Sequence, residues 1–309
     1  MENYRLKVFR AVAAHASFRK ASEALHLSQP AVSQHIHALE EELGARLFDR
    51  SGNRTSLTQA GKVLLRYAER SARILEEART AVAKLDGELS GELRLGASTT
   101  VAQYILPRIL GAFLKDNPKV TLSVVSGNTE EIVALLLKDS IVLGMIEGPP
   151  LSKEVHIDKF LDDTMVLIAS ASHEWAGLAS VPLNSLVEVP LLLREQGSGS
   201  RRVVEQALKR AGLPPGQLQI RMELDSTEAI ISGVEAGLGL GFVSSWAIGK
   251  AFRLGTVVPV RVDGLEIHRD LTIVRRLGPP PEGVAASFQR FALAQNAGLS
   301  AGKKSRAGR

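Results

Sequence analysis

The sequence contains no cysteine, which excludes disulfide frameworks and thiolate metal sites and fits a protein of the reducing cytoplasm. No apolar run approaches the roughly 20 residues that a membrane-spanning helix needs, because the best candidate, 132–146, is interrupted by Lys138 and Asp139. The N-terminal stretch also lacks the basic and then apolar order of a signal peptide. We therefore expect a cytoplasmic protein with no membrane partner. Aromatic residues make up only 5% of the chain, which argues against a large ligand held between stacked rings.

Motifs of the common enzyme classes are missing as well. The sequence has no G-x-S-x-G nucleophile motif, no H-E-x-x-H zinc motif and no Walker-type phosphate loop. The glycine-rich stretch 237–241 leads into an expected strand instead of following one, so we interpret it as a helix stop and not as a dinucleotide loop. His35 and His37 are two positions apart on an expected helix and point in different directions, which excludes a metal pair. We expect no enzymatic activity, no metal and no cofactor.

The net charge of +5 is concentrated at the two ends of the 309-residue chain. Residues 1–66 carry ten Lys and Arg against six Asp and Glu, and residues 303–309 add four further positive charges. A basic N-terminal domain is what binding to nucleic-acid phosphates requires. We interpret residues 301–309 as a disordered basic tail. The length predicts about two domains.

Apolar periodicity predicts three short helices near the N-terminus, at 4–15, 18–25 and 29–43. Ser17 is placed to cap the second helix, Pro30 occupies the first turn of the third, and Gly44 ends it. One face of the third helix carries Val32, Ile36, Leu39 and Leu43, which must pack against the first two helices. Its other face is polar and carries Gln29, Ser33, Gln34 and His37. Such groups hydrogen-bond base edges or phosphates in a helix-turn-helix protein, although a solvated face of an ordinary three-helix bundle is the alternative.

A small hairpin is expected after the third helix. Two short stretches, 47–50 and 55–58, flank a Gly- and Asn-containing turn and are expected to form its two strands. Arg50 and Arg54 lie near its tip, where they can hold the DNA backbone or enter a minor groove. The hairpin turns the helical bundle into a winged helix-turn-helix, over residues 1–59.

A long amphipathic helix is predicted from Thr58, its N-cap, to about Leu89. The apolar positions recur at alternating spacings of three and four and are Ala60, Leu64, Tyr67, Ser71, Ile74, Ala78, Val82 and Leu85. This is the pattern of a coiled-coil seam, so we interpret residues 60–90 as a linker helix that dimerises the chain. The alternative is a helix that packs on its own domain.

The stretches SFRKASEALHLSQPAVSQHIHALEEELGARLFDR and TSLTQAGKVLL resemble the DNA-binding domain of the LysR-type transcriptional regulators. The resemblance implies groove contacts at Gln29, Pro30, Ser33, Gln34 and His37, and phosphate contacts at Arg50 and Arg54. It implies double-stranded promoter DNA as a partner, a homodimer formed by the linker helix, a homotetramer of two such dimers, and contact with RNA polymerase. Family members often have Arg or Lys near the positions of His35 and His37, which leaves the operator preference open.

From residue 91 the pattern changes to alternating strands and helices, which predicts two parallel-rich lobes joined by a hinge. The expected strands are 92–97, 120–126, 141–147, 164–170, 189–195, 219–224, 240–244 and 267–275. Lobe 1 covers about 91–161 and 269–300, and lobe 2 about 162–268. The fold class is thus an N-terminal all-α winged helix-turn-helix with a linker helix, followed by a two-lobed α/β domain. In the LysR family the matching part, here 91–300, is a periplasmic-binding-protein-like (type 2) effector domain.

Ligands in such sheets bind beyond the carboxyl ends of the strands, where helix N-termini point. The residues at those positions are mostly hydroxyl or amide side chains: Ser98, Thr99, Thr100, Asn128, Thr129, Glu147, Gln196, Ser198, Ser200, Arg201, Ser226 and Thr227. Capping of the following helix is the alternative for each single loop. Their convergence from both lobes predicts a site for a small anion. Glu147 does not suit such a site unless it pairs with Arg201 or holds a water.

The runs GASTTVAQYILPRIL and REQGSGSR resemble LysR branches that sense sulfite, sulfate-like oxyanions or small carbon metabolites, of the CysL, YeiE and CbbR kinds. This resemblance implies an oxyanion such as sulfite or sulfate as effector, with Arg194 and Arg201 as further candidate contacts. The function predicted is a ligand-responsive, homo-oligomeric transcriptional regulator. Two alternatives remain: an α/β solute-binding module or enzyme with a helical dimerisation segment, and an architectural DNA binder with a vestigial pocket.

Overall fold

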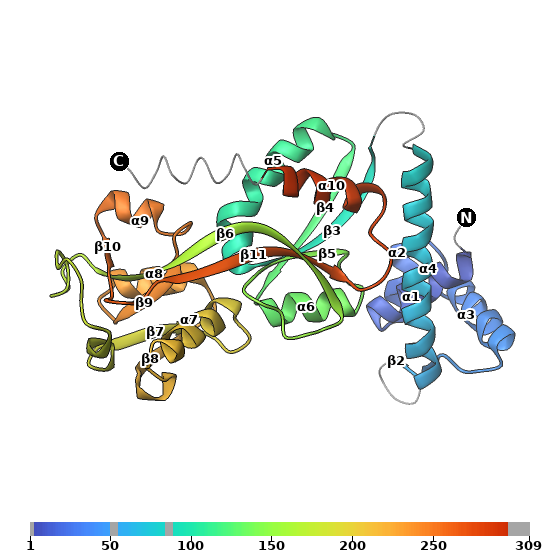
Figure 1. The fold of residues 1–309 in the computed structure, drawn as a ribbon. Helices are drawn as coiled ribbons and strands as arrows, with labels where there is room; N and C mark the ends of the chain where they lie inside the picture. The colour runs from blue at the N-terminus through green and yellow to red at the C-terminus, as the bar shows by residue number, and fades with distance from the viewer. Residues whose placement is uncertain (1–2, 50–54, 84–88, 296–309) are drawn as a thin grey trace. The chain divides into compact units, whose positions relative to one another are not determined.

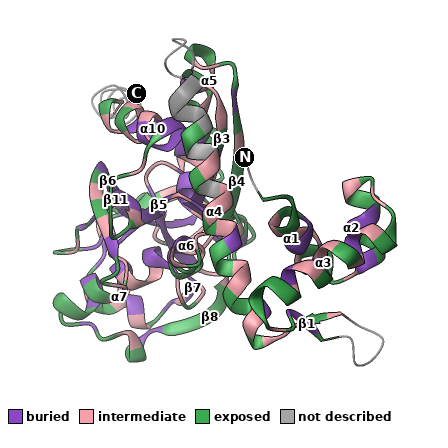
Figure 2. Ribbon diagram, turned by 90° about the vertical axis from the view of Figure 1, so that its right-hand side faces the viewer, coloured by how far each residue is buried: buried purple, intermediate pink, exposed green. Residues whose placement is uncertain are grey.

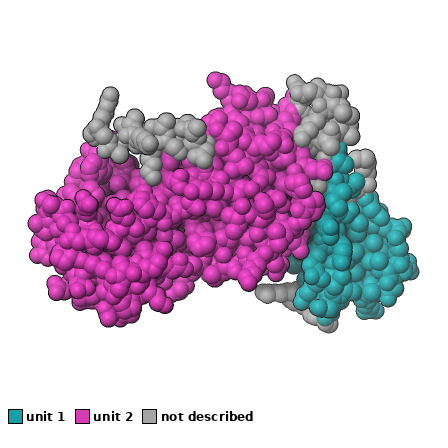
Figure 3. Space-filling view, viewed as in Figure 1, with its two compact units in different colours: residues 1–87 teal, residues 88–309 magenta. Residues whose placement is uncertain are grey.

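A computed structural model describes residues 3–49, 55–83 and 89–295 of the chain. The chain divides into two compact units, Met1–Gly87 and Glu88–Arg309 (Figure 3). Arg50, Arg54 and the basic tail at 301–309 lie outside the described residues. Among the described helices, none combines the length and the apolar character that crossing a membrane would take.

The first unit contains the three predicted helices at the predicted positions. Its elements are α1 (Tyr4–His15), α2 (Phe18–Leu25), α3 (Gln29–Leu43), β1 (Phe48–Asp49), β2 (Ser56–Leu57) and α4 (Gln59–Ala83). Ser17 accepts a hydrogen bond from the Lys20 amide and so caps α2, while Gly44 ends α3 in the left-handed region at φ 62°. β1 and β2 form the expected antiparallel hairpin, with Phe48 opposite Leu57. The helices and the hairpin are therefore confirmed.

Aromatic rings hold the helices and the hairpin of this unit together. Phe48 of β1 packs against Phe9 and Phe18, with ring centroids 5.3 and 5.6 Å apart. The apolar stripe of α3 contributes Val32 and Ile36 to the same core. Leu43 was expected to join this stripe, but its side chain is 47% exposed because it lies in the last turn of the helix, beyond the core. The opposite face of α3 is consequently turned outward.

The apolar face of the long helix α4 is packed on its own unit near the N-terminus and exposed further along. Thr58 accepts a hydrogen bond from the Gly61 amide at 3.0 Å, which confirms it as the N-cap. Ala60 and Leu64 pack on the core of their own unit, which is the alternative that the sequence left open for this helix. Tyr67 and Ile74 are 63% and 54% exposed. Ala60 and Leu64 therefore contact their own unit, while Tyr67 and Ile74 of the same face remain exposed, and the seam between chains stays a prediction.

The C-terminal part of this helix is only partly described. The helix is described to Ala83, and the expected end near Leu89 follows residues 84–88, which lie outside the described part of the chain. The side chain of Val82 and the whole of Leu85 lie outside the described part of the chain.

The second unit is built on one mixed sheet crossed by two long antiparallel strands. The strands are β3 (Gly91–Ser98), β4 (Val120–Gly127), β5 (Leu143–Glu147), β6 (Val155–Ser170), β7 (Pro190–Arg194), β8 (Gln219–Leu224), β9 (Leu240–Ser244), β10 (Val257–Val260) and β11 (Ile267–Arg276). Their order is β4-β3-β5-β11-β6-β9-β7-β8, with β10 beside β6. β3, β4 and β5 are parallel to one another, as are β7, β8 and β9. The two parallel groups confirm the expected lobes, and β6 and β11 run through both.

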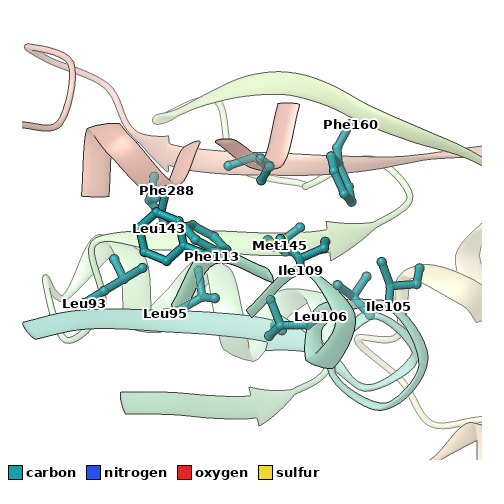
Figure 4. Packing of buried hydrophobic residues seen from close by; sticks show 14 of the residues in the cluster. Leu93, Leu95, Ile105, Leu106, Ile109, Phe113, Leu143, Met145, Phe160 and Phe288 are labelled. Atoms are coloured by element: carbon teal, nitrogen blue, oxygen red, sulfur yellow. The ribbon is translucent and has the colours of Figure 1, made fainter. Parts of the chain in front are cut away.

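The helices of this unit cover the sheet on both faces. They are the π-helical turn η2 (Val101–Ile105) and the α-helices α5 (Leu106–Asp116), α6 (Thr129–Leu137), α7 (Gly199–Arg210), α8 (Thr227–Glu235), α9 (Gly249–Leu254) and α10 (Gly283–Ala294). In the lobe of β3–β5, α5 and α10 cover one face and α6 the other (Figure 1). Figure 4 shows how the side chains of β3, β5, α5 and α10 interdigitate. Phe113 of α5 meets Phe288 of α10 edge to face, with centroids 5.3 Å apart.

The hydrophobic core changes from one lobe to the other at a definite point of each crossing strand. Along β6, Leu161 belongs to the core of the first lobe and Met165 to that of the second. Along β11, the change lies between Ile267 and Leu271. The residues between these pairs are polar, and Asp163 and Arg269 are buried there. The lobes therefore meet over a short polar section of two strands.

Candidate functional sites

The outer face of α3 presents the polar side chains that the sequence assigns to DNA. Gln29, Pro30, Gln34 and His37 are exposed, and Ser33 is half-buried. The cap of this helix is Ser28, which accepts a hydrogen bond from the Ala31 amide, so none of these five side chains is consumed by capping. The arrangement leaves the N-terminal half of α3 free to contact base edges.

Two residues that the sequence analysis did not assign to DNA binding, Glu40 and His35, support this face from within the unit. Glu40 accepts hydrogen bonds from the amides of Leu47 at 2.7 Å and Phe48 at 3.3 Å, which ties α3 to the first strand of the hairpin. His35 packs edge-on against the ring of Tyr4, with centroids 5.3 Å apart. Glu40 thus fixes the hairpin relative to α3, and His35 serves packing within the unit.

In the second unit, three of the predicted effector residues are used for capping. Asn128 caps α6 in a reciprocal capping box with Glu131. Ser198 caps α7, and Ser226 caps α8. Their side-chain oxygens accept hydrogen bonds from backbone amides of the helix that follows. For these three residues, helix capping, the alternative to effector binding, is confirmed. The caps place the N-termini of the three helices at the interlobe edge, but they do not by themselves make a site.

The lobes contact each other directly through the N-terminal residues of η2 and α8. The hydroxyls of Thr100 and Thr227 lie 3.0 Å apart in a buried position. One turn further, the Tyr104 hydroxyl donates a hydrogen bond to Glu228. Burial and the neighbouring Glu228 carboxylate both raise the pKa of Tyr104, so its phenol stays protonated and available as a donor. Thr100 and Thr227 are thereby brought together as the sequence predicts, and Tyr104 is an addition.

A second contact joins α6 of one lobe to α7 of the other. The Glu130 amide of α6 donates to the Gly197 carbonyl, which precedes α7, at 3.3 Å, and the Glu130 carboxylate accepts a hydrogen bond from Arg202 of α7 at 2.7 Å. Within the first lobe, the Thr129 hydroxyl donates to the Glu147 carbonyl at 3.0 Å. A Cβ on Gly199 would lie 1.8 Å from the Glu147 carbonyl oxygen. The N-terminus of α7 therefore lies directly on the end of β5, at a distance that only glycine permits.

A buried group of charged side chains lies at the same place. Arg269 donates to Asp163 through Nε at 2.8 Å and to the Ser200 hydroxyl through Nη1 at 2.7 Å. Its Nη2 lies 2.8 Å from Glu147 Oε2, an ion pair without hydrogen-bond alignment. We call these four residues the Arg269 cluster. Burial alone would lower the pKa of Arg269, but the charges of Glu147 and Asp163 outweigh it and raise the pKa above its ordinary value.

The expected pairing of Glu147 with Arg201 is wrong. Arg201 is bound instead to Glu205 and Glu223, each at 2.7 Å, and to the carbonyl of Arg194 at 3.0 Å. It lies one helix position beyond Ser200, and its side chain is directed along α7 and onto β8. The counter-ion of Glu147 comes from β11 instead, a strand that is distant in sequence and adjacent in the sheet.

Three buried donor groups at strand ends have no hydrogen-bond partner among the described residues. They are the hydroxyls of Ser98 and Thr99 at the end of β3, and Nη1 of Arg194 at the end of β7. The remaining donors of Arg194 bind Glu195 and the carbonyl of Asp225, which precedes the Ser226–Thr227 turn. Since Thr227 meets Thr100, both strand ends lie beside the same interlobe contact. Gln196 is exposed nearby. Unpaired donors beside helix N-termini suit an anion.

The two parts of the chain match two families. Residues 4–62 match the family described as bacterial regulatory helix-turn-helix protein, lysR family, and residues 86–297 match the LysR substrate binding domain. The chain belongs to the LysR family of transcriptional regulators. Proteins matched in this family regulate transcription and are not enzymes, which confirms the prediction of a DNA-binding regulator without enzymatic activity.

Several similar proteins are described as RuBisCO transcriptional regulators. The RuBisCO operon transcriptional regulator of Allochromatium vinosum is 34% identical over 292 residues, covering 94% of this chain and 95% of that protein. A probable RuBisCO transcriptional regulator of Cyanophora paradoxa is 35% identical over 272 residues, covering 87% and 84%. The resemblance to the CbbR-like branch is thereby confirmed.

Solved structures of LysR regulators share this fold. Full-length CbnR complexed with its target DNA superposes with a TM-score of 0.70 at 24% identity, covering 96% of this chain and 99% of that one. The CcmR regulatory domain of Synechocystis PCC6803, in complex with 2-PG, gives a TM-score of 0.61 at 27% identity. That match covers 66% of this chain and 96% of the CcmR domain. The winged helix-turn-helix followed by a two-lobed α/β domain is therefore confirmed.

Replacing Arg269 should cost far more stability than replacing another arginine of the same strand. Arg269→Met leaves two buried carboxylates without their cation, which typically costs about 3–5 kcal/mol. Arg276 pairs with Asp139 at 3.0 Å on the surface of β11, so Arg276→Met should cost less than about 1 kcal/mol. Urea unfolding of the full-length variants gives both free energies. Equal losses would show that the Arg269 cluster does not stabilise the fold.

Proposed function

We propose that this LysR-type regulator acts as a homo-oligomer in the cytoplasm, reads promoter DNA with the outer face of α3 and responds to a small anion held between its lobes. The proposed domains are residues 1–59 for DNA binding, 60–90 for linkage and dimerisation, 91–300 for effector binding and 301–309 as a basic tail. RNA polymerase is the partner that a promoter-bound regulator would contact.

The exposed polar face of α3 carries the proposal for DNA reading. Gln29, Ser33 and Gln34 occupy the first two turns of the helix, the part that enters the major groove in helix-turn-helix proteins. A glutamine amide donates and accepts hydrogen bonds at once, and it can therefore pair with both groups of an adenine edge. Arg50 and Arg54 are proposed for phosphate contacts on the resemblance alone. The named relatives make DNA upstream of RuBisCO genes the first DNA to test.

The unpaired donors between the lobes support the proposal for an anionic effector. Ser98, Thr99 and Arg194 provide buried donors, and the N-termini of α6, α7 and α8 add partial positive charge. CcmR, which shares this fold, is described in complex with 2-PG, a small organic anion. We therefore propose a small carbon-metabolite anion before sulfite or sulfate. The predicted residues that serve as caps, Asn128, Ser198 and Ser226, are proposed only to orient the helices.

Exposed apolar side chains support self-association. Tyr67 and Ile74 are seven positions apart on α4, the spacing of a coiled-coil seam. The two outermost strands of the sheet, β4 and β8, are exposed along most of their length (Figure 2), and they carry Val124, Val125, Ile220 and Met222. An open strand edge can pair with another chain, and exposed apolar patches mark interaction surfaces. Two kinds of contact are thus available, as a dimer that pairs into a tetramer requires.

The proposed mechanism couples the effector to the spacing of two recognition helices. An anion that draws the lobes together changes the shape of the surface on which neighbouring effector domains pack. Because a dimer binds paired half-sites, a change in that packing alters the fit of both α3 helices to the DNA. The coupling is allosteric, since the effector and the DNA bind different sites of one assembly.

Gln34→Ala should weaken specific DNA binding without changing assembly. Loss of one base contact typically costs about 1–3 kcal/mol, or roughly five- to a hundredfold in affinity. The measurement is a gel shift on operator DNA with nonspecific DNA as competitor. Gln206→Ala, which removes an exposed glutamine of α7, is the matched control and should bind normally. An unchanged operator preference for Gln34→Ala would remove its base-reading role.

Ser98→Ala should reduce the affinity for 2-PG, measured by calorimetry with the full-length protein. A hydrogen bond to a charged ligand contributes about 1.5–3 kcal/mol, so a loss of roughly ten- to a hundredfold is expected. Ser226→Ala removes a helix cap and should leave the affinity within a factor of about three. Titration with sulfate tests the second class of anion. The absence of binding by either anion would contradict the proposed effector site.

Ile74→Asp should dissociate the assembly, because a carboxylate placed on the α4 seam would be buried without a partner. A dissociation constant raised by at least about tenfold, or 1.4 kcal/mol, is expected in analytical ultracentrifugation. Ile157→Asp changes a similarly exposed isoleucine of β6, at 46% against 54% exposure, and is the control. Equal behaviour of the two variants would refute the proposed seam.

A further inference from the structure

Arg269 lies where the chain crosses between the lobes, and its guanidinium contacts side chains of three different elements. Asp163 is its cross-strand partner on β6. Glu147 ends β5 in the first lobe, and Ser200 is the second residue of α7 in the second lobe. All four residues of the Arg269 cluster are at most 5% exposed. A single cation therefore connects the crossing strands with both lobes.

The three contacts of Arg269 differ in how they respond to lobe movement. Asp163 and Arg269 are directly opposite each other on strands that pass through both lobes, so a rotation of the lobes leaves their contact in place. Glu147 is attached to the same ladder through its pairing with Leu271 of β11. Ser200 alone is carried by a helix that packs on the second lobe. Among the contacts of Arg269, the bond to Ser200 is therefore the one that separation of the lobes would stretch.

The backbone around Ser200 is built for a close approach to the first lobe. Gly199 lies on the Glu147 carbonyl, and a Cβ on Gly148, whose φ is +71°, would meet the Gly199 carbonyl oxygen at 3.0 Å. Ser198 already caps α7, so the Ser200 hydroxyl is not needed for the helix. It is bound to Arg269 at 2.7 Å. Hydrogen bonds of this charge-assisted kind are roughly twice as strong as neutral ones.

The charges of the Arg269 cluster explain why the guanidinium stays in place. Two carboxylates face one cation, and Asp163 also accepts hydrogen bonds from the Thr164 amide and the Ser245 hydroxyl. Movement of the guanidinium away from Asp163 would leave buried negative charge unpaired, which is unfavourable. The neutral Ser200 hydroxyl is the partner that can leave at the least electrostatic cost.

We propose that Arg269 is a positioning residue that holds the N-terminus of α7 against the first lobe, with the Ser200–Arg269 bond setting the fraction of molecules whose lobes are in contact. The effect on the ligand rests on the proposed function: if an anion binds the closed arrangement, its apparent affinity is proportional to that fraction. The Ser200–Arg269 bond therefore changes the apparent affinity for the effector, although neither residue belongs to the proposed anion donors Ser98, Thr99 and Arg194.

The test compares Ser200→Ala with Ser198→Ala in the full-length protein by amide hydrogen exchange without ligand. The Glu130 amide of the first lobe donates to the Gly197 carbonyl of the second, so its exchange rate reports lobe contact. Ser200→Ala should accelerate exchange at Glu130 by roughly tenfold, the change that follows from loss of one such bond. Ser198→Ala should act on Arg201, whose amide it caps, and leave Glu130 near the wild-type rate.

An exchange rate at Glu130 within twofold of wild type in Ser200→Ala would overturn the proposal. So would an equal acceleration in Ser198→Ala, because this would assign the effect to the helix cap. Calorimetry with 2-PG then tests the coupling: Ser200→Ala should weaken binding by a factor similar to that seen in exchange, and unchanged or tighter binding contradicts it. If the wild type does not bind 2-PG at all, the proposed effector fails while the exchange result still decides the role of Arg269.

Discussion

The ion pairs of Arg269 are the interaction on which the second unit depends. Two carboxylates and one guanidinium are taken out of water at the point where β6 and β11 pass between the lobes. Such burial is unfavourable unless every partner is in place, and here the partners come from β5, β6 and β11. The buried charges are therefore neutralised only when these three strands pair correctly. Ser200 extends this requirement to the placement of α7.

The ends of the helices show how a polar residue near a ligand site is divided between structural and binding roles. Asn128, Ser198 and Ser226 lie where an anion site was expected, yet each side chain is used by the helix that it caps. Ser98 and Thr99 belong to the same kind of loop, but η2 begins without a side-chain cap and their hydroxyls are left over. This strand end therefore keeps two buried hydroxyls that no helix cap uses.

The sequence predicts the first unit more completely than the second, and the reason is the distance between interacting residues. The helices α1, α2 and α3 begin and end at local signals such as Ser17 and Gly44, which act within a few positions. Arg269 is 106 positions from Asp163, and Thr100 is 127 positions from Thr227. The Thr100–Thr227 pair could be anticipated from the rule for strand ends. Arg269 lies in the middle of a strand, where no local pattern indicates a site.

Two of the expected elements, the strand at 164–170 and the long helix, show what the side-chain pattern leaves undetermined. The beginning of β6 at Val155 was missed, because its acidic and basic residues interrupt the apolar alternation that marks a strand. Pairing with β11 along its whole length supplies what the side-chain pattern lacks. The first turns of α4 were assigned to a seam between chains because their spacing fits one. Ala60 and Leu64 fit the core of their own unit equally well, and the spacing does not distinguish a partner within the chain from one outside it.

The charge balance between the lobes limits how an anion can be held there. The Arg269 cluster carries two negative charges and one positive, so it offers an anion no net attraction. Arg194 is also paired, since two of its donor groups bind the Glu195 carboxylate and only Nη1 remains unpartnered among the described residues. Attraction must then come from oriented hydroxyls and helix N-termini, whose effect falls off within a turn of the helix.

Such donors favour a small ligand that reaches several of them at once, because each acts only at short range. The negative cluster beside them disfavours anions that merely carry more charge. Shape and donor geometry, more than net charge, would therefore decide which anion this regulator accepts.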